Sequence, residues 1–381
     1  MNAGFRAVRD RIRFLRSRVR ERLWVKPLMV CVLSILAAFV AKFADRVAFL
    51  QVFPDITVDS IDALLTILSA GMLGVAVFAV GAMISAYASA SNTATPRAFP
   101  VVIADDLSQN ALSAFVGAFI YSIVALVALK NGYYGSAGRF VLFVVTVFVL
   151  VVIILNFIRW IDRIARLGRM GNTIDRVEEV TADAMRRRRQ APTLGAHKAR
   201  DQVGRVPIYA DRIGYVQRID LSRLQALAER FELFITVVSL PGAFVTPDRP
   251  LAYLSGDKRT AKGEPDPTRM ADAFVIGKDR VFDQDPRFGL VVLSEIASRA
   301  LSPAVNDPGT AIEVIGSLVR LFAMWAEPNP PSETPAIDFD RVAAPEISAE
   351  DMFDDAFKAL SRDGAGTIEV VVRLPKALAA L

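Results

Sequence analysis

The stretch "FVLFVVTVFVLVVIILNFI", residues 140–158, decides the class of fold, because Thr146 and Asn156 are its only polar side chains. A helix rises 1.5 Å per residue, so this stretch covers about 28 Å, close to the roughly 30 Å of hydrocarbon in a bilayer. Backbone polar groups inside lipid must be satisfied within the segment itself, which a helix achieves. We therefore expect a transmembrane helix here.

The composition of the whole chain indicates two unlike regions. Of its 381 residues, 53% are hydrophobic, which is high for a soluble protein, while 22% are charged, which is high for a chain that is buried in lipid throughout. The long apolar runs gather in residues 28–158, and residues 159–381 have an ordinary charge content. The predicted fold is a membrane α-helical four-helix transmembrane bundle followed by a cytosolic α/β (α+β) domain.

Four spans are expected in the transmembrane domain, residues 27–158, after a basic cytoplasmic segment of residues 1–26. The first has a short apolar run, so its charged side chains at Lys42, Asp45 and Arg46 should lie at an interface or face other helices. A cleaved signal peptide is the competing interpretation of the first apolar run, but no small-residue cleavage site precedes a polar start. The expected spans are residues 27–50, 61–88, 111–129 and 140–158.

The distribution of Lys and Arg predicts the orientation. These residues are dense before the first span and after the fourth, and sparse between the first and second spans and between the third and fourth. Cytoplasmic loops carry the excess of positive charge. We therefore expect a multi-pass protein of the bacterial inner membrane, in contact with the lipid bilayer, with both termini cytoplasmic.

One side of the second span carries mainly small side chains. They recur at intervals of four, which lets another helix backbone approach closely. Packing within the chain is the favoured interpretation, and a face that lines a pore or contacts another subunit of a homo-oligomer is the alternative. The residues of this small-residue face are Gly81, Ser85, Ser89, Ala82 and Ala86.

The pattern changes after the fourth span. Residues 159–190 keep helical spacing and predict a stalk, and residues 191–207 contain Pro and Gly and predict a linker. Residues 208–381 then form a mixed α/β domain of short units. Expected strands include "GYVQRID" from Gly214 and "GTIEVVVRL" from Gly366, and "LSRLQALAERF" from Leu221 is an expected amphipathic helix.

The sequence lacks the residues that most familiar catalytic mechanisms require. The chain has one His, His197, and one Cys, Cys31, which excludes a zinc site built on His or Cys ligands. There is no P-loop and no Rossmann glycine motif, so no cofactor is expected. The basic residues lie beside apolar segments, so a nucleic-acid partner is not expected either. Carboxylate-only catalysis or Mg²⁺ binding stays open if Asp283, Asp285 and Asp307 converge.

The most unusual soluble stretch is "RALSPAVNDPGTAIE", residues 299–313, between two amphipathic helical patterns. Ser302 precedes a proline and should end the first helix, and Asp307 should cap the second helix, which begins at Pro308. A tight corner between helices therefore accounts for the motif. The alternative is a polar pocket for a ligand or for coupling to another subunit, formed by Arg280, Gln284, Asp285, Glu295, Arg299, Ser302, Asn306 and Asp307.

The stretch "DQDPRFGLVVLSEIASRALSPAVNDPGTA" closely resembles the signature of a bacterial family of predicted membrane proteins, domain of unknown function 2254. "TPRAF" at 95–99, "GYVQRID" and "PGAFVTPDRPLA" resemble the same family. The resemblance implies a four-span inner-membrane protein with a cytosolic domain and supplies no reaction. It also implies a motif leading into the third span, at Pro96, Arg97, Asp105 and Gln109.

Two departures from the family pattern stand out. Arg280 is followed by Val281 where the family usually has Thr, which removes a hydroxyl from that position. Members of the family also usually continue beyond the position of Leu381, which raises a shortened C-terminus as an alternative.

The sequence thus favours a non-enzymatic, oligomeric membrane protein with a cytosolic domain that senses or binds a ligand, and a channel is the boldest form of this hypothesis. Two alternatives stay open. One is a membrane-anchored enzyme that uses carboxylates or Mg²⁺, and the other is a scaffold that recruits partners. The identity of any small ligand or ion does not follow from the sequence.

Overall fold

The computed structural model describes residues 24–43, 45, 56–93, 95–103, 106–166, 170–199, 206–256, 266–328 and 337–381. The chain divides into two compact units. The helical unit holds Arg18–Asn92 and Phe99–Asn172, and the α/β unit holds Thr93–Ala98 and Thr173–Leu381. The short segment Thr93–Ala98 therefore belongs to the α/β unit, although in sequence it is enclosed by the helical unit.

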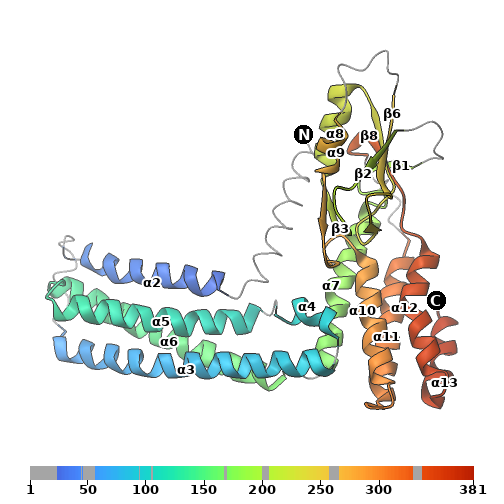
Figure 1. Cartoon of the computed structure of the whole chain (residues 1–381). Coiled ribbons are helices and arrows are strands. Elements are labelled where there is room, and N and C mark those ends of the chain that lie inside the picture. Colours follow the sequence, from blue (N-terminus) through green and yellow to red (C-terminus); the bar gives the residue numbers. More distant parts are fainter. Residues whose placement is uncertain are drawn as a thin grey trace. The chain divides into compact units, whose positions relative to one another are not determined.

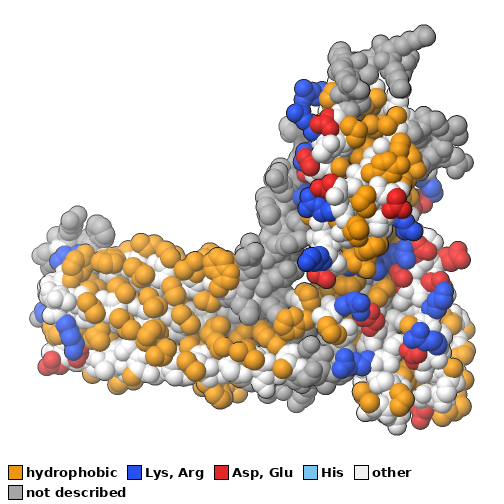
Figure 2. All heavy atoms as spheres, in the orientation of Figure 1, with side chains coloured by type: hydrophobic (Ala, Val, Ile, Leu, Met, Phe, Trp, Pro, Cys, Tyr) orange, Lys and Arg blue, Asp and Glu red, His pale blue; other side chains and the backbone are white. Residues whose placement is uncertain are grey.

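The described part of the N-terminal half contains four long apolar helices, as predicted. In this unit α2 packs against α5 and α6, and α5 packs against α6 (Figure 1). Hydrophobic side chains cover most of the visible surface of these helices (Figure 2), as expected for helices solvated by lipid. The bounds are α2 Val25–Phe43, α3 Val58–Thr93, the short α4 Phe99–Ile103, α5 Asp106–Lys130 and α6 Ser136–Arg166, with a 3₁₀ turn, η3, at Pro96–Ala98.

Aromatic and hydroxyl side chains fix the packing inside the helical unit. Trp160 is buried and lies edge-to-face with Phe115, with 6.2 Å between ring centroids. The hydroxyl of Tyr121 lies 2.9 Å from Thr146 Oγ1, and the hydroxyl of Tyr134 donates to the Ala38 carbonyl at 2.8 Å. These polar contacts join α5 to α6 and the α5–α6 turn to α2. They give the buried hydroxyl groups hydrogen-bond partners within the protein, so that no water is required.

Three of the four helices, α3, α5 and α6, are long and apolar enough to cross a bilayer, over Val58–Ala88, Gln109–Lys130 and Ser136–Asp162. The apolar part of α2 is shorter, Val25–Val40, and the described helix ends at Phe43. Of the expected first span, residues 44 and 46–50 lie outside the described residues. Asp45 accepts hydrogen bonds from the Gly135 and Gly138 amides at 2.9 and 2.7 Å, which places it at the beginning of α6.

The α/β unit contains two sheets. The larger has the order β1-β8-β4-β6-β2, in which β8 is parallel to both β1 and β4 and the other pairs are antiparallel. The smaller has the order β5-β3-β7 and is antiparallel. The strands are β1 Ala196–Lys198, β2 Val206–Tyr209, β3 Gly214–Ile219, β4 Phe234–Val237, β5 Phe244–Val245, β6 Pro250–Ser255, β7 Phe274–Gly277 and β8 Phe339–Ala344.

Helices pack beside and against these sheets. α8 packs on β8 and β4, and its buried side chains Leu224, Ala228 and Phe231 join the sheet core. α10 packs against α11 and α12, and α11 packs against α13 (Figure 1). The bounds are α7 Met170–Gln190, α8 Leu221–Phe231, α9 Pro267–Ala271, α10 Pro286–Ala300, α11 Pro308–Ala326, α12 Ala349–Gly364 and α13 Ile368–Leu378.

Two expectations about the α/β domain were wrong. The expected linker, residues 191–207, contributes β1, which pairs with β8, a strand at 339–344 that the sequence did not predict. The expected strand "GTIEVVVRL" is the beginning of α13, because Val370, Leu374 and Ala377 are buried at helical spacing and this packing overrides the strand preference of a valine run.

Helix α11 also has the length and composition of a membrane span. It packs against α10 and α13 within the α/β unit, and Arg320 on its surface forms two hydrogen bonds with Glu178 of α7, at 2.7 and 2.6 Å. The packing accounts for its apolar face, so we assign α11 to the α/β unit.

Candidate functional site

The site begins where α10 begins. Asp285 is the N-cap residue and accepts a hydrogen bond from the Phe288 amide at 3.2 Å, and Pro286 occupies the first turn. An aspartate at this position satisfies an amide that has no partner within the helix, and its charge meets the positive end of the helix dipole. The "DQDP" part of the predicted motif is therefore the start signal of α10.

Asp285 also lies at the centre of a buried cluster of charges, here called the Arg–Asp cluster: Arg188, Arg280 and Asp285. The Arg280 guanidinium donates two hydrogen bonds to the carboxylate, at 2.7 and 3.0 Å. The Arg280 and Asp285 side chains are 18% and 2% exposed, which distinguishes this pair from a surface ion pair of little energetic value. Arg188 comes from α7, and its guanidinium donates to the Gln284 carbonyl at 3.1 Å.

The strands of the sheets contribute to the same cluster. Gln284 accepts a hydrogen bond from the Ile219 amide of β3 at 3.3 Å. Gly242, in the turn before β5, has a φ of +95°, and a Cβ at this position would lie 2.3 Å from Asp285 Oδ2. Only glycine allows this backbone conformation and this approach together. The "PGAF" and "DQDP" motifs, far apart in sequence, therefore meet at one carboxylate.

Burial dominates the electrostatics of the cluster. Desolvation raises the pKa of Asp285, while the hydrogen bonds from Arg280 and the charge of Arg188 act in the opposite direction. Desolvation also lowers the pKa of Arg188 to about 10, although Asp285 stabilises its charge. Among the described residues, Arg188 Nη1 is buried and has no hydrogen-bond partner. The cluster thus carries the free-energy cost of desolvating charged groups, and it joins α7, β3 and α10.

The joint after α10 is an exposed corner. The Asp307 amide donates to the Ala300 carbonyl at 2.8 Å, and Asn306 has a φ of +49° that turns the chain. Asp307 caps α11 through the Thr310 amide at 3.1 Å and the Thr310 hydroxyl at 2.6 Å, and these hydrogen bonds lower the pKa of Asp307. Ser302 donates to the Arg299 carbonyl at 2.7 Å, and Arg299 itself is exposed. The geometry is that of the predicted tight corner.

The predicted pocket residues do not all come together. Asp285 precedes α10 and Asp307 follows it, and a helix of 15 residues is about 22 Å long. The expectation that Asp283, Asp285 and Asp307 could converge is therefore wrong, because α10 holds its two ends apart. The described residues contain no group of three or more His, Cys, Asp or Glu side chains that could hold a metal ion.

Glu295, in the middle of α10, contacts the "TPRAF" segment. Its carboxylate accepts hydrogen bonds from Thr95 Oγ1 at 3.1 Å and from Arg97 Nη1 at 2.5 Å. Pro96 between them is exposed and begins η3. Of the other residues of the predicted motif, Gln109 is buried in α5, and Asp105 lies outside the described residues. The link between residues 95–97 and Glu295 joins two motifs that the sequence alone did not connect.

The small-residue face of α3 is open in the single chain. Gly81 and Ser85 are exposed, and a Cβ at Gly81 would meet nothing within 4 Å. Ala82 and Ala86 are half-buried, and the side chain of Ser89 lies outside the described residues. The helix instead uses Ala76, Ala79, Met83 and Tyr87 as its buried side. Among the described residues, Gly81 and Ser85 are therefore not buried by packing within the chain, and the role of this face stays a prediction.

Several residues of the site were missed by the sequence interpretation. The run "RRRR" at 186–189 was taken as positive charge beside a membrane. Arg187 instead donates to the Asp283 carbonyl at 2.8 Å, and Arg188 is buried in the cluster. Gly289 shows the same tight joining of α7 to α10, because a Cβ there would lie 1.8 Å from Thr181 Oγ1. The available signal was helical spacing, because Arg188 follows Val177, Thr181 and Met185 at intervals of three or four on the buried side of α7.

Comparison with known proteins supports the architecture. Residues 20–380 match a family model described as "Predicted membrane protein (DUF2254)". The "Uncharacterized protein Mb1321c" of Mycobacterium bovis and the "Uncharacterized protein Rv1290c" of Mycobacterium tuberculosis are each 37% identical over 123 residues. That match covers 32% of this chain and 24% of each relative. No solved structure matches. Because the family model covers nearly the whole chain, this protein belongs to the DUF2254 family of predicted membrane proteins.

Proposed function

We propose that the protein is a non-enzymatic membrane protein in which helix α10 passes changes in the α/β domain to the apolar helices. The observation that carries this proposal is that α10 binds two segments that are covalently joined to those helices. Glu295 binds Thr95 and Arg97, which lie between α3 and α4 in sequence. The turn before α10 binds Arg187 and Arg188 at the end of α7, which follows α6.

The two contacts of α10 differ in how easily they can be broken, which suits a helix that passes conformational changes from the α/β domain to the apolar helices. The Arg–Asp cluster is buried and would resist separation, because breaking a buried ion pair leaves an uncompensated charge. The contact of Arg97 with Glu295 is more exposed, with side-chain exposures of 59% and 29%, and is easier to break. α10 therefore holds one firm attachment and one weaker attachment, as expected for an element that can move relative to one of its anchors.

The described residues hold no group of three or more His, Cys, Asp or Glu side chains that could bind a metal ion, which favours a sensing or binding role over a Mg²⁺-dependent enzyme. The positive charge beside the spans supports placing this domain, and both termini, on the cytoplasmic side of a bacterial inner membrane.

We extend the proposal to a homo-oligomer assembled through the small-residue face of α3. Gly81 and Ser85 are exposed in the single chain, and small residues at this spacing allow close helix contacts in lipid. A channel-like role would follow if this face surrounds a conduit. Gly81→Leu should then reduce both the oligomeric mass and any solute flux in proteoliposomes. Absence of flux from the wild-type protein at every membrane potential and tension would remove the channel form.

The transmission itself can be tested by hydrogen exchange on the full chain in lipid nanodiscs. We expect Glu295→Gln to speed amide exchange in residues 95–103 and in the first turns of α5, with exchange in the two sheets unchanged. The matched control is Glu313→Gln, which removes an exposed carboxylate from the neighbouring helix α11 and should leave residues 95–103 unchanged. Equal exchange of this segment in Glu295→Gln and wild type would overturn the role of α10.

A further inference from the structure

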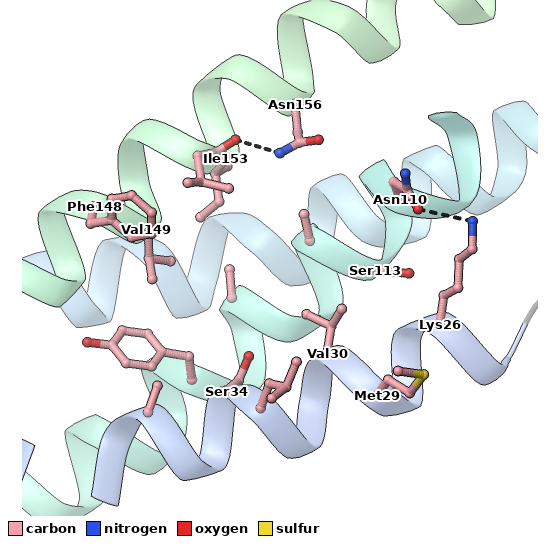
Figure 3. Close-up of a pocket in the computed structure, with 16 residues that line it drawn as sticks. Lys26, Met29, Val30, Ser34, Asn110, Ser113, Phe148, Val149, Ile153 and Asn156 are labelled. Atoms are coloured by element: carbon pink, nitrogen blue, oxygen red, sulfur yellow. Dashed lines mark hydrogen bonds between the residues drawn. The ribbon is translucent and has the colours of Figure 1, made fainter. Parts of the chain in front are cut away.

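A groove between α2, α5 and α6 of the helical unit is not used by the function proposed above. Its volume is about 610 Å³, and 16 residues line it (Figure 3). Most of the lining is apolar, and the side chains of Met29, Leu33 and Phe148 are 60%, 60% and 66% exposed at its sides. Such a groove lies open to the surroundings of the helices along its length, where the solvent would be lipid.

Most polar residues of the groove lie toward one end, and Ser34 lies farther along it (Figure 3). Figure 3 shows Lys26, Asn110 and Ser113 near one another, with Asn156 of α6 toward the same end, whereas Phe148 and Val149 lie toward the other end. Lys26 Nζ donates to Asn110 Oδ1 at 3.1 Å. The groove therefore combines a cationic, hydrogen-bonding end with a mainly apolar remainder.

The length of the groove matches the depth of one lipid leaflet. Along α2 the lining runs from Lys26 to Ala37, and along α5 from Asn110 to Tyr121. Eleven helical rises correspond to about 16 Å. Half of the hydrocarbon thickness of a bilayer is about 15 Å. A molecule with its polar part at Lys26 would thus reach the middle of the membrane with its apolar part.

We propose that this groove binds one anionic phospholipid, with its phosphate at Lys26 and Asn110 and an acyl chain along Val30, Leu33 and Phe148. Charge complementarity selects the anionic headgroup, because lysine at a membrane surface attracts negatively charged lipids. The matched length selects a lipid over a small soluble anion. The arginine-rich sequence before α2 would place the headgroup in the cytoplasmic leaflet. This inference depends on the helices lying in a bilayer and does not depend on the role of α10.

The test uses the full chain in detergent and native mass spectrometry with added phosphatidylglycerol or phosphatidylcholine. We expect one phosphatidylglycerol per chain to be retained in preference to phosphatidylcholine. Lys26→Gln should weaken phosphatidylglycerol binding about fivefold, the effect of one lysine near an anionic lipid surface. Lys26→Arg should retain it. Lys42→Gln, an equal charge change on the same helix but outside the groove, should leave binding unchanged.

A second measurement separates groove binding from loss of folding in a variant. In wild-type protein, a phosphatidylglycerol that carries a photoreactive acyl chain should label peptides of α2, α5 and α6 that line the groove. Labelling confined to other helices would overturn the proposal. So would equal binding of phosphatidylglycerol by Lys26→Gln and wild type, or an equal loss in Lys42→Gln, which would indicate diffuse attraction of charge.

Discussion

Gly242 shows how single residues join distant parts of this chain. Its φ of +95° is a conformation that side chains rarely adopt, and its missing side chain leaves room for the Asp285 carboxylate. The sequence indicated a turn at the Pro-Gly pair but gave no sign of its partner. A packing requirement between residues more than forty positions apart leaves no periodic pattern that can be followed along the chain.

Gly242→Ala should therefore destabilise the α/β unit strongly. We expect a loss of about 2–4 kcal/mol, the combined cost of strained backbone and displacement of a buried, hydrogen-bonded carboxylate. Thermal unfolding of the full chain in mild detergent measures it. Gly366→Ala is the control, because a Cβ there would meet nothing within 4 Å, and it should change stability by less than about 0.5 kcal/mol. Equal midpoints for the two variants would contradict the close contact at Asp285.

Glu178 makes stability depend on pH. Burial raises the pKa of Glu178, but the hydrogen bonds and charge of Arg320 hold this pKa below its ordinary value. A carboxylate whose pKa is lower in the folded state than in the unfolded chain stabilises the protein fully when the pH is above the unfolded-state pKa. This contribution to the free energy of unfolding is lost as the pH falls through the folded-state pKa.

Glu178→Gln should accordingly lower stability at pH 7 by about 0.5–1 kcal/mol, or about 2 °C in midpoint, a modest effect because the pair is partly exposed to solvent. The difference between variant and wild type should shrink below about pH 4, where the wild-type carboxyl is protonated. Midpoints measured from pH 7 to pH 3.5 test this. A difference that stays constant over that range would mean that the ion pair is not its cause.

The helices α10 and α11 each begin with Asp followed by Pro, and in both the aspartate accepts an amide of the first turn. The two caps differ in their surroundings, because Asp285 is buried among arginines while Asp307 is exposed at the corner. Cap signals of this kind are local, which is why the sequence located the start of α11 at Pro308.

Asp307→Ala should cost about 1 kcal/mol through loss of the cap, and Asp307→Asn clearly less, since asparagine also caps helices well. Thermal midpoints of the two variants, compared with wild type, measure the difference. A large, equal loss in both would show that the carboxylate charge of Asp307 has a role beyond capping, as a ligand site at the corner would require.

Whether an element was predictable depended on where its partners lie. Helix α8 was predicted with its observed bounds, because its apolar stripe and its Asp220 cap are both local. Strand β1 has three residues and exists because β8, more than a hundred residues later, pairs with it. Helix α13 was mistaken for a strand because the valine run has a strand preference that packing on α11 overrides.

For the whole molecule, the division into an apolar helical half and a mixed α/β half followed from composition, since lipid and water select side chains differently. The candidate site was predicted less well. The motif of residues 280–307 was found, but its residues divide between a buried cluster before α10, a contact in its middle and a corner after it. The burial of Arg188 was missed, because arginines near spans usually serve as interfacial charge.

The central claim is that the apolar helices span a bilayer with the α/β domain on the cytoplasmic side, because the sensing role, the oligomer and the lipid groove all require it. Single cysteines introduced in a Cys31→Ser background test it directly. An impermeant maleimide applied to intact bacterial cells should label Asn131→Cys, in the exposed turn between α5 and α6. It should label Asp211→Cys, in the exposed turn between β2 and β3, only after the cells are permeabilised. Labelling of Asp211→Cys in intact cells would contradict the account.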